Sequence, residues 1–189
     1  MDHRPGSDSE HESTTASASG PAVRLRDGTP VQLRPMSRSD LELERRFVEG
    51  LSARSGYQRL LSGRRPTLAD LERWTDIDPA REIALIAVAV VDGSEQQLGV
   101  ARCVLDEEEP TRWDFAIVVG DAWQGQGLGH ALLQRLIQCA DESSVPMLSS
   151  IVLSENRRML DLALRLGFEI RREPGGAIVK RIERRAPRS

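Results

Sequence analysis

The sequence predicts a single domain of the α/β (α+β) class, with a mixed, mostly antiparallel central sheet flanked by helices. Three observations support this prediction. Apolar runs with strand character alternate with segments of helical spacing, three of the runs follow one another as a meander, and a glycine-rich loop joins a strand to the longest amphipathic segment. The length of 189 residues suits one domain with a substantial core.

The two ends of the chain differ from its middle in composition. Residues 1–20 are rich in Ser, Thr, Gly and acidic side chains, and we expect this tail to be disordered because it cannot bury enough apolar surface to offset its ordering entropy. We place the folded domain at residues 21–184. Residues 185–189 form a basic tail, and the other basic residues near it are interpreted as solvated.

The first elements predicted are a hairpin and helices. The apolar runs at 23–26 and 31–34 flank Asp27-Gly28, a dipeptide typical of hairpin turns. The helices are expected at residues 41–51 with Ser39 as N-cap, at residues 53–61, and at residues 68–75 with Thr67 as N-cap.

The second half of the chain supplies most of the sheet. Strands are predicted at residues 83–91, 98–105 and 113–119, and the turn Asp92-Gly93 makes the first two an antiparallel pair. The remaining elements expected are a helix at 127–143, a strand at 147–153, a helix at 157–166, and strands at 168–171 and 177–182.

Composition excludes several classes of function. The formal net charge is −3, from 26 basic and 29 acidic residues, so no nucleic-acid partner is expected. No apolar run reaches the roughly 20 residues of a membrane helix, and no secretory signal opens the chain, so we expect a cytoplasmic protein without a membrane partner. The two cysteines, Cys103 and Cys139, could formally form a disulfide, but we favour buried, reduced thiols. No His, Cys or Asp cluster has metal-ligand spacing, so no metal is expected.

The most informative segment is the loop Gln124-Gly125-Gln126-Gly127-Leu128-Gly129-His130, which leaves a strand and opens a helix. Glycines allow close backbone approach, and the unpaired N–H groups of a first helical turn favour an anion. A Walker A loop would need Gly-Lys-Ser/Thr where this chain has Gly129-His130-Ala131, and a dinucleotide fingerprint has other glycine spacing. A coenzyme A pyrophosphate loop is the third alternative.

Two motifs resemble those of a known family. Gln124-x-x-Gly127-x-Gly129 resembles the coenzyme A pyrophosphate motif of the GNAT acyltransferases, and the segment from Asn156 to Gly167-Phe168 resembles the family's fourth-helix signature. Segments such as Leu33-Arg34-Pro35-Met36 are similar to the acetyltransferase domain of bacterial Pat-type protein lysine acetyltransferases. The resemblance covers roughly residues 22–183 and implies a single GNAT-like domain that uses acetyl-CoA as co-substrate.

The resemblance also implies a coenzyme site. Backbone groups of Ile117, Val118 and Val119 would pair with the pantetheine arm, and Asn156 would contact the coenzyme near the splay of two strands. The amides that would hold the pyrophosphate belong to Gln124, Gly125, Gln126, Gly127, Leu128, Gly129 and His130. The alternatives are a plain strand-to-helix turn for the glycines, a solvated helix residue for His130 and an N-cap for Asn156.

The reaction needs a neutral amine, and forming it from a lysine of pKa near 10.4 costs about 4.6 kcal/mol at pH 7. In the Pat-type family a glutamate at the start of the fourth strand is the candidate base. The matching position is Asp114, which could instead be a structural acid paired with an arginine. Glu82 is the second candidate base, or a group that orients the substrate. The late tyrosine of many GNAT enzymes is replaced by Ala163, so the thiolate would take a proton from water.

We therefore expect an N-acetyltransferase that moves an acetyl group from acetyl-CoA to a protein lysine or a small-molecule amine, by direct attack in a ternary complex. The acceptor site is expected along the helices of residues 39–75. The alternative hypothesis is a coenzyme-A-binding regulatory module without turnover, which the aspartate at 114 and the missing tyrosine motivate.

Overall fold

The computed structural model describes residues 22–52, 55, 66–172 and 178–187. The tail at residues 1–20 and, apart from Ser55, the helix predicted at 53–61 lie outside the described residues. Within the described part, no helix is long and apolar enough to cross a membrane.

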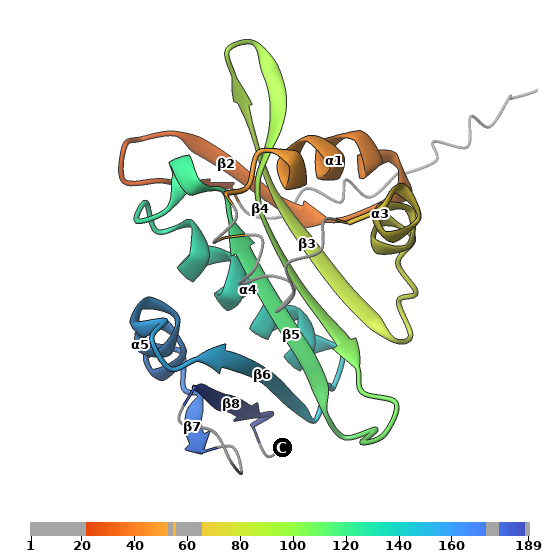
Figure 1. The fold of residues 1–189 in the computed structure, drawn as a ribbon, viewed down its shortest axis with the longest axis vertical. Coiled ribbons are helices and arrows are strands. Elements are labelled where there is room, and N and C mark those ends of the chain that lie inside the picture. Colours follow the sequence, from red (N-terminus) through yellow and green to blue (C-terminus); the bar gives the residue numbers. More distant parts are fainter. Residues whose placement is uncertain (1–21, 53–54, 56–65, 173–177, 188–189) are drawn as a thin grey trace, which may run out of the picture.

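One eight-stranded sheet in the order β1-β2-β3-β4-β5-β6-β8-β7 runs through the molecule (Figure 1). All neighbouring strands are antiparallel except β5 and β6, which are parallel. The mixed, mostly antiparallel sheet predicted from the sequence is thereby confirmed. The strands are β1 (Ala22–Arg24), β2 (Pro30–Pro35), β3 (Glu82–Val91), β4 (Ser94–Leu105), β5 (Trp113–Val119), β6 (Met147–Leu153), β7 (Glu169–Arg172) and β8 (Val179–Arg185).

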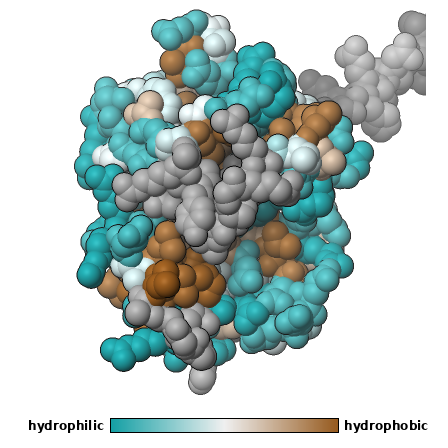
Figure 2. Space-filling model, in the orientation of Figure 1, coloured by the Kyte–Doolittle hydropathy of each residue, from teal (hydrophilic) through white to brown (hydrophobic). Residues whose placement is uncertain are grey.

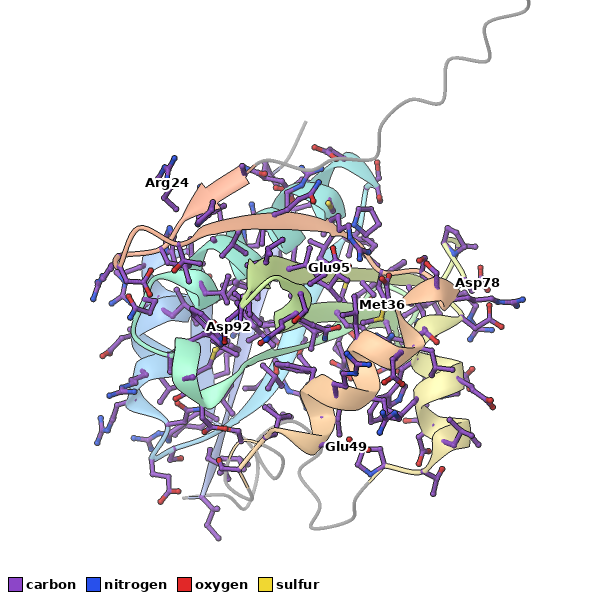
Figure 3. All side chains as sticks on the ribbon, turned by 90° about the horizontal axis from the view of Figure 1, so that it is seen from above. Arg24, Met36, Glu49, Asp78, Asp92 and Glu95 are labelled. Carbon is purple, nitrogen blue, oxygen red and sulfur yellow. The ribbon has the colours of Figure 1, made fainter. Side chains whose placement is uncertain are left out.

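Helices cover both faces of this sheet. They are α1 (Leu41–Glu49), α3 (Leu68–Thr75), α4 (Leu128–Glu142) and α5 (Arg157–Arg165), with short 3-10 turns at Arg38–Asp40 and Asp121–Trp123. Seen from above, α1 lies against one face, and Met36 lies between it and the sheet (Figure 3). The long helix α4 packs on the opposite face.

The sheet separates two apolar layers, and β3 contributes to both. Leu85 and Ala87 of β3 join the core under α4, whereas Ile86 and Val88 join the core under α1. Successive side chains of a strand point to opposite faces, so a strand covered on both faces is apolar at nearly every position. This explains the unbroken apolar run at residues 83–91.

The start of α1 differs from the prediction. Ser39 is not its N-cap, because the chain first makes the 3-10 turn Arg38–Asp40, for which Ser37 is the N-cap. The buried Asp40 carboxylate accepts the Ser37 N–H at 2.8 Å and two bonds from the Arg34 guanidinium at 2.8 and 2.7 Å. The segment therefore begins with a local capping box of Ser37 and Asp40, two residues before the predicted cap, and the charged hydrogen bonds from Arg34 of β2 reinforce it.

Two other predictions have opposite outcomes. Thr67 is the N-cap of α3, and its hydroxyl accepts the Asp70 N–H at 3.3 Å, as predicted. The basic residues Lys180, Arg181, Arg184 and Arg185 are not part of a solvated tail, because they belong to strand β8, whose Arg185 pairs with Met147 of β6. Arg188 lies outside the described residues. Arg184 also binds both carboxylate oxygens of Asp141, at 2.9 and 3.0 Å, and so attaches the end of β8 to α4.

Candidate functional site

The parallel strands β5 and β6 diverge soon after they meet. They pair only at Trp113 with Leu148 and at Asp114 with Ser149. Beyond this point a groove of about 260 Å³ opens between them, and Figure 2 shows an apolar area on this face beside α5 and β6. The groove is lined by Asp114, Phe115, Ala116, Ile117, Ser150, Ile151, Val152, Leu153, Asn156 and Met159. The structure thus brings Asp114, Ile117 and Asn156 to one opening, although they are far apart in sequence.

The edge of β5 that faces the groove has backbone groups available to a ligand. On its other edge, Ile117, Val118 and Val119 pair with β4, whereas no described strand pairs with them on the groove side. Backbone N–H and C=O groups require partners, and an extended ligand that carries amides can supply them as an added strand would. The Val119 carbonyl also accepts a bond from the Gln124 side-chain amide at 3.2 Å.

The glycine loop follows β5 after the 3-10 turn Asp121–Trp123 and leads into α4. Gly125 and Gly127 have φ values of 77° and 95°, in the left-handed region that favours glycine. Gly127 is the N-cap of α4 and has no side chain to occupy the N–H groups of the first turn, which belongs to Leu128, Gly129 and His130. These groups and the helix dipole make the start of α4 suited to an anion.

The third glycine of the loop has no internal explanation. A methyl group at Gly129 would lie 3.7 Å from the Val119 side chain and 3.9 Å from that of Leu162, which are ordinary contacts. Neither backbone conformation nor crowding inside the protein therefore requires glycine here. A ligand that approaches the backbone closely would require it, which argues against a plain strand-to-helix turn.

A polar network attaches the loop to the segment after α1. The Asp121 carboxylate accepts the Ser52 N–H and hydroxyl, both at 2.9 Å, and the Ser55 hydroxyl at 2.8 Å. Gln124 donates from its side chain to the Ser55 hydroxyl at 3.2 Å. Burial raises the pKa of Asp121, but the hydrogen bonds from Ser52 and Ser55 outweigh this effect and lower the pKa below its ordinary value.

The surroundings of Asp114 are compatible with both roles considered from the sequence, a base and an acid paired with an arginine. Its half-exposed carboxylate lines the groove, and the Arg112 Nε lies 3.6 Å away. Burial raises the pKa of Asp114 above its ordinary value, although the Arg112 charge opposes this change. Arg112 also contacts Asp106 and Glu109, so its charge is shared among three carboxylates. A carboxyl with a raised pKa is a stronger base than an ordinary aspartate.

Glu82 lies on the same face of the sheet as Asp114 but not at the groove. Residues paired across strands share a face, and Glu82 pairs with Val104, which pairs with Asp114. Two strand spacings separate the backbones of the two acids by about 10 Å. The Glu82 carboxylate is 12% exposed and lies 3.6 Å from Arg102 and 3.7 Å from Arg73. It lines a separate pocket of about 530 Å³ beside the end of α3 and the end of α4.

The remaining predicted residues have clear positions. Asn156 is the N-cap of α5, where its side chain accepts the Met159 N–H at 3.2 Å, and it also lines the groove. His130 is exposed in the first turn of α4.

Cys103 is buried, and burial raises its pKa to about 12, so it is not a nucleophile at neutral pH. In the described part of the chain, no three potential metal ligands cluster.

Sequence reasoning missed the residues that hold the loop from behind and from the side. Asp121 lies 69 and 66 residues from Ser52 and Ser55, and Arg26 lies 99 residues from Gly125, whose carbonyl it binds. Periodicity and local motifs report only on neighbours within a few turns. No signal in a single sequence identifies these contacts.

Comparisons with known proteins agree with this geometry. The family model for an acetyltransferase (GNAT) domain matches residues 31–169. An acetyltransferase of Pseudomonas aeruginosa is 32% identical over 151 residues, which cover 79% of this chain and 81% of that protein. The acetyltransferase Pat of Mycolicibacterium smegmatis is 30% identical over 161 residues, and the match covers 85% of this chain but only 48% of that protein.

The fold has solved relatives as well. The GNAT domain of the S. lividans PAT superposes with a TM-score of 0.78 at 26% identity, covering 90% of this chain and 98% of that domain. The likeness therefore extends from the strand order to nearly the whole of a known domain.

Proposed function

This chain belongs to the GNAT acetyltransferase family and is an acyl-CoA-dependent N-acyltransferase, and from this premise we propose that it transfers an acetyl group from acetyl-CoA to an amine by direct attack within a ternary complex. The observation that carries the proposal is the groove between β5 and β6, which opens beside the glycine loop. The pantetheine arm would lie along residues 117–119, and the pyrophosphate would lie at the start of α4.

In this arrangement the thioester carbonyl lies near Ala116 and Asp114. The amine nitrogen attacks the carbonyl carbon, a C–N bond forms, and the C–S bond breaks. An acceptor that arrives as an ammonium first loses one proton to Asp114, directly or through a water molecule, and Asp114 passes it to solvent. After the attack the nitrogen loses a second proton by the same route, which leaves the neutral amide. The coenzyme leaves as a thiolate and takes a proton from water, because Ala163 is fully buried and has no proton to donate.

Glu82 has a different part in this proposal. It lies on the face of Asp114, two strands away, and its carboxylate is held close to the charges of Arg73 and Arg102. It is too distant to abstract the proton from an amine that attacks beside Asp114. We therefore assign it to orienting the acceptor, which approaches along the face covered by α1 and α3.

A protein lysine is the first acceptor class and a small-molecule amine the second. The resemblance to Pat-type protein lysine acetyltransferases supports the first, and the similarity to the Pat enzyme of M. smegmatis agrees with it. The chain spans about half of that enzyme, so an acceptor known for the longer protein is not transferred to this one. A cytoplasmic location, where acetyl-CoA and reduced thiols coexist, is part of the proposal.

The test follows free thiol release from acetyl-CoA with a panel of acceptors that contains lysine peptides, lysine-rich proteins, polyamines and small amines. We expect release that depends on the acceptor and an acetylated product with a mass increase of one acetyl group. Calorimetry with coenzyme A alone provides the binding control. Coenzyme binding without acceptor-dependent thiol across the whole panel would instead support a regulatory module.

A further inference from the structure

The tip of the β1–β2 hairpin contacts the glycine loop from the side opposite the proposed ligand. The hairpin closes through the Gly28 N–H, which donates to the Leu25 carbonyl at 2.9 Å, and this turn projects Arg26. The Arg26 N–H donates to the Gln126 carbonyl at 3.1 Å, and its guanidinium Nη1 donates to the Gly125 carbonyl at 3.0 Å. Figure 1 shows this hairpin beside the N-terminal end of α4.

These two bonds determine how two successive peptide planes of the loop are turned. In a planar trans peptide, the C=O of one residue and the N–H of the next point in opposite directions. Because the Gly125 and Gln126 carbonyls point toward Arg26, the N–H groups of Gln126 and Gly127 point away from the hairpin. Neither N–H has a hydrogen-bond acceptor among the described residues. Both are donors available to an anion.

The loop has a particular need for such support. Gln126 lies between Gly125 and Gly127, and glycine has the widest backbone freedom of any residue. Without a partner behind them, these peptide planes could rotate and turn carbonyl oxygens toward the ligand, where they would repel phosphate. Holding donors in the bound orientation lowers the ordering cost of binding, which is the general effect of preorganisation.

We propose that Arg26 is a positioning residue for the diphosphate of the coenzyme, which acts by orienting the Gln126 and Gly127 amides from behind the loop. This inference rests on the proposed function, because it takes the loop as the coenzyme site. Arg26 itself does not touch the reacting atoms. Its side chain preorganises donors for a diphosphate, and it has no part in binding the pantetheine arm or the acyl group.

The experiment compares two acyl donors on the full chain. Arg26→Ala keeps the backbone N–H and removes only the guanidinium, so the loss is that of one charge-assisted bond. We expect the kcat/KM for acetyl-CoA and the calorimetric affinity for coenzyme A to fall about fivefold to tenfold. The kcat/KM for acetyl-pantetheine, which lacks the diphosphate, should stay at the wild-type value. Arg26→Lys should recover part of the loss, because an ammonium group still donates to a carbonyl.

Arg24→Ala is the matched control. Arg24 lies on the same hairpin, donates to the Gly28 carbonyl at 3.2 Å and lies at the outer edge of the sheet (Figure 3). The Arg24→Ala variant should keep the wild-type kcat/KM for acetyl-CoA and for acetyl-pantetheine. An equal loss for acetyl-CoA and acetyl-pantetheine in Arg26→Ala, or no loss for either, would overturn the inference. A wild-type protein that does not bind coenzyme A would instead overturn the proposed function, which distinguishes the two failures.

Discussion

The proposed coenzyme side and the proposed acceptor side of the site are built from different chemical groups. The coenzyme side uses backbone groups: the open edge of β5 and the amides of the loop that starts α4. The acceptor side uses carboxylates, Asp114 on β5 and Glu82 on β3, each within 4 Å of an arginine. A site formed by backbone groups needs only one segment with a particular backbone conformation. A site formed by side chains depends on separate elements that meet in the folded state.

In the proposed site, this difference also separates the groups that bind the coenzyme from the groups that take part in the reaction. Backbone donors are uncharged and stay in place over a wide pH range, which suits a coenzyme whose phosphates carry permanent charge. The carboxylates can exchange protons, which suits an acceptor amine that must lose one. Substitutions on the two sides should therefore change different kinetic constants.

The largest expected effect is on the coenzyme side. Gly127→Trp places a bulky side chain at a residue with φ of 95°, in front of the first turn of α4. Coenzyme binding measured by calorimetry should fall below detection. The matched control is Gly93→Trp, at the tip of the β3–β4 hairpin, where φ is 78° and the space around the residue is equally open. Both variants should lose about 1–3 kcal/mol of folding stability from backbone strain. Equal coenzyme affinity in the two would contradict the loop assignment.

The next effect is on the acceptor side. Asp114→Ala should lower kcat about 10²-fold, the usual contribution of a positioned base, with little change in coenzyme affinity. Since the pKa of Asp114 is raised, wild-type activity should fall as the pH drops through this raised value, and the acid limb should disappear in the variant. Glu82→Gln should mainly raise the KM for the amine. If instead Glu82→Gln has the larger loss in kcat, the two roles must be exchanged.

The smallest effect tests the link between the two sides. Asp121→Ala removes the acceptor for Ser52 and Ser55, and we expect the KM for acetyl-CoA and for the amine each to rise about fivefold. Because its pKa is lowered, the Asp121 carboxylate is ionised at every pH above about 3.9, the ordinary pKa of an aspartate. Its hydrogen bonds from Ser52 and Ser55 are lost only when the pH falls through the lowered pKa. The difference from wild type should therefore be constant between about pH 6 and pH 8.

Asp141→Ala is the control for this last change. It also removes a hydrogen-bonded carboxylate, the one paired with Arg184 at the far end of α4. Its effect should appear as a lower melting temperature with both KM values unchanged. A rise in KM in this variant would mean that general loosening of α4, and not the Asp121 network, links the two substrates.

The parts of the fold predicted from the sequence are those that local chemistry determines. The apolar run of β3, the Asp92-Gly93 turn and the Thr67 cap depend on neighbours in the chain, and all three appear as expected. Ser39 was the wrong cap, because the local capping box is formed by Ser37 and Asp40, and Arg34 from β2 holds the Asp40 carboxylate in place. Likewise, a strand was predicted at residues 177–182, but its continuation to Arg185 depends on pairing with β6, which its basic composition does not show.

The same division applies to the candidate site. The glycine spacing indicated the loop, because left-handed backbone and close approach are local requirements. The side chains behind the loop, Arg26 and Asp121, come from residue pairs separated by more than 60 positions, and only the folded chain relates them. The separation of Asp114 from Glu82 also required the strand register, since both lie at the ends of strands in the sequence.

The two paired positions between β5 and β6 have a consequence for the integrity of the whole sheet. They are the smallest number of paired positions between any two neighbouring strands of the sheet, and they join a five-strand part to a three-strand part. A coenzyme bound in the groove where these strands diverge would bridge the two parts as an added strand would, and would contribute to folding stability as well as to the reaction. Binding at one hundred times the dissociation constant adds about 2.7 kcal/mol to the stability of the folded state. The concentration of acyl donor would then govern the lifetime of the folded enzyme as well as its reaction rate.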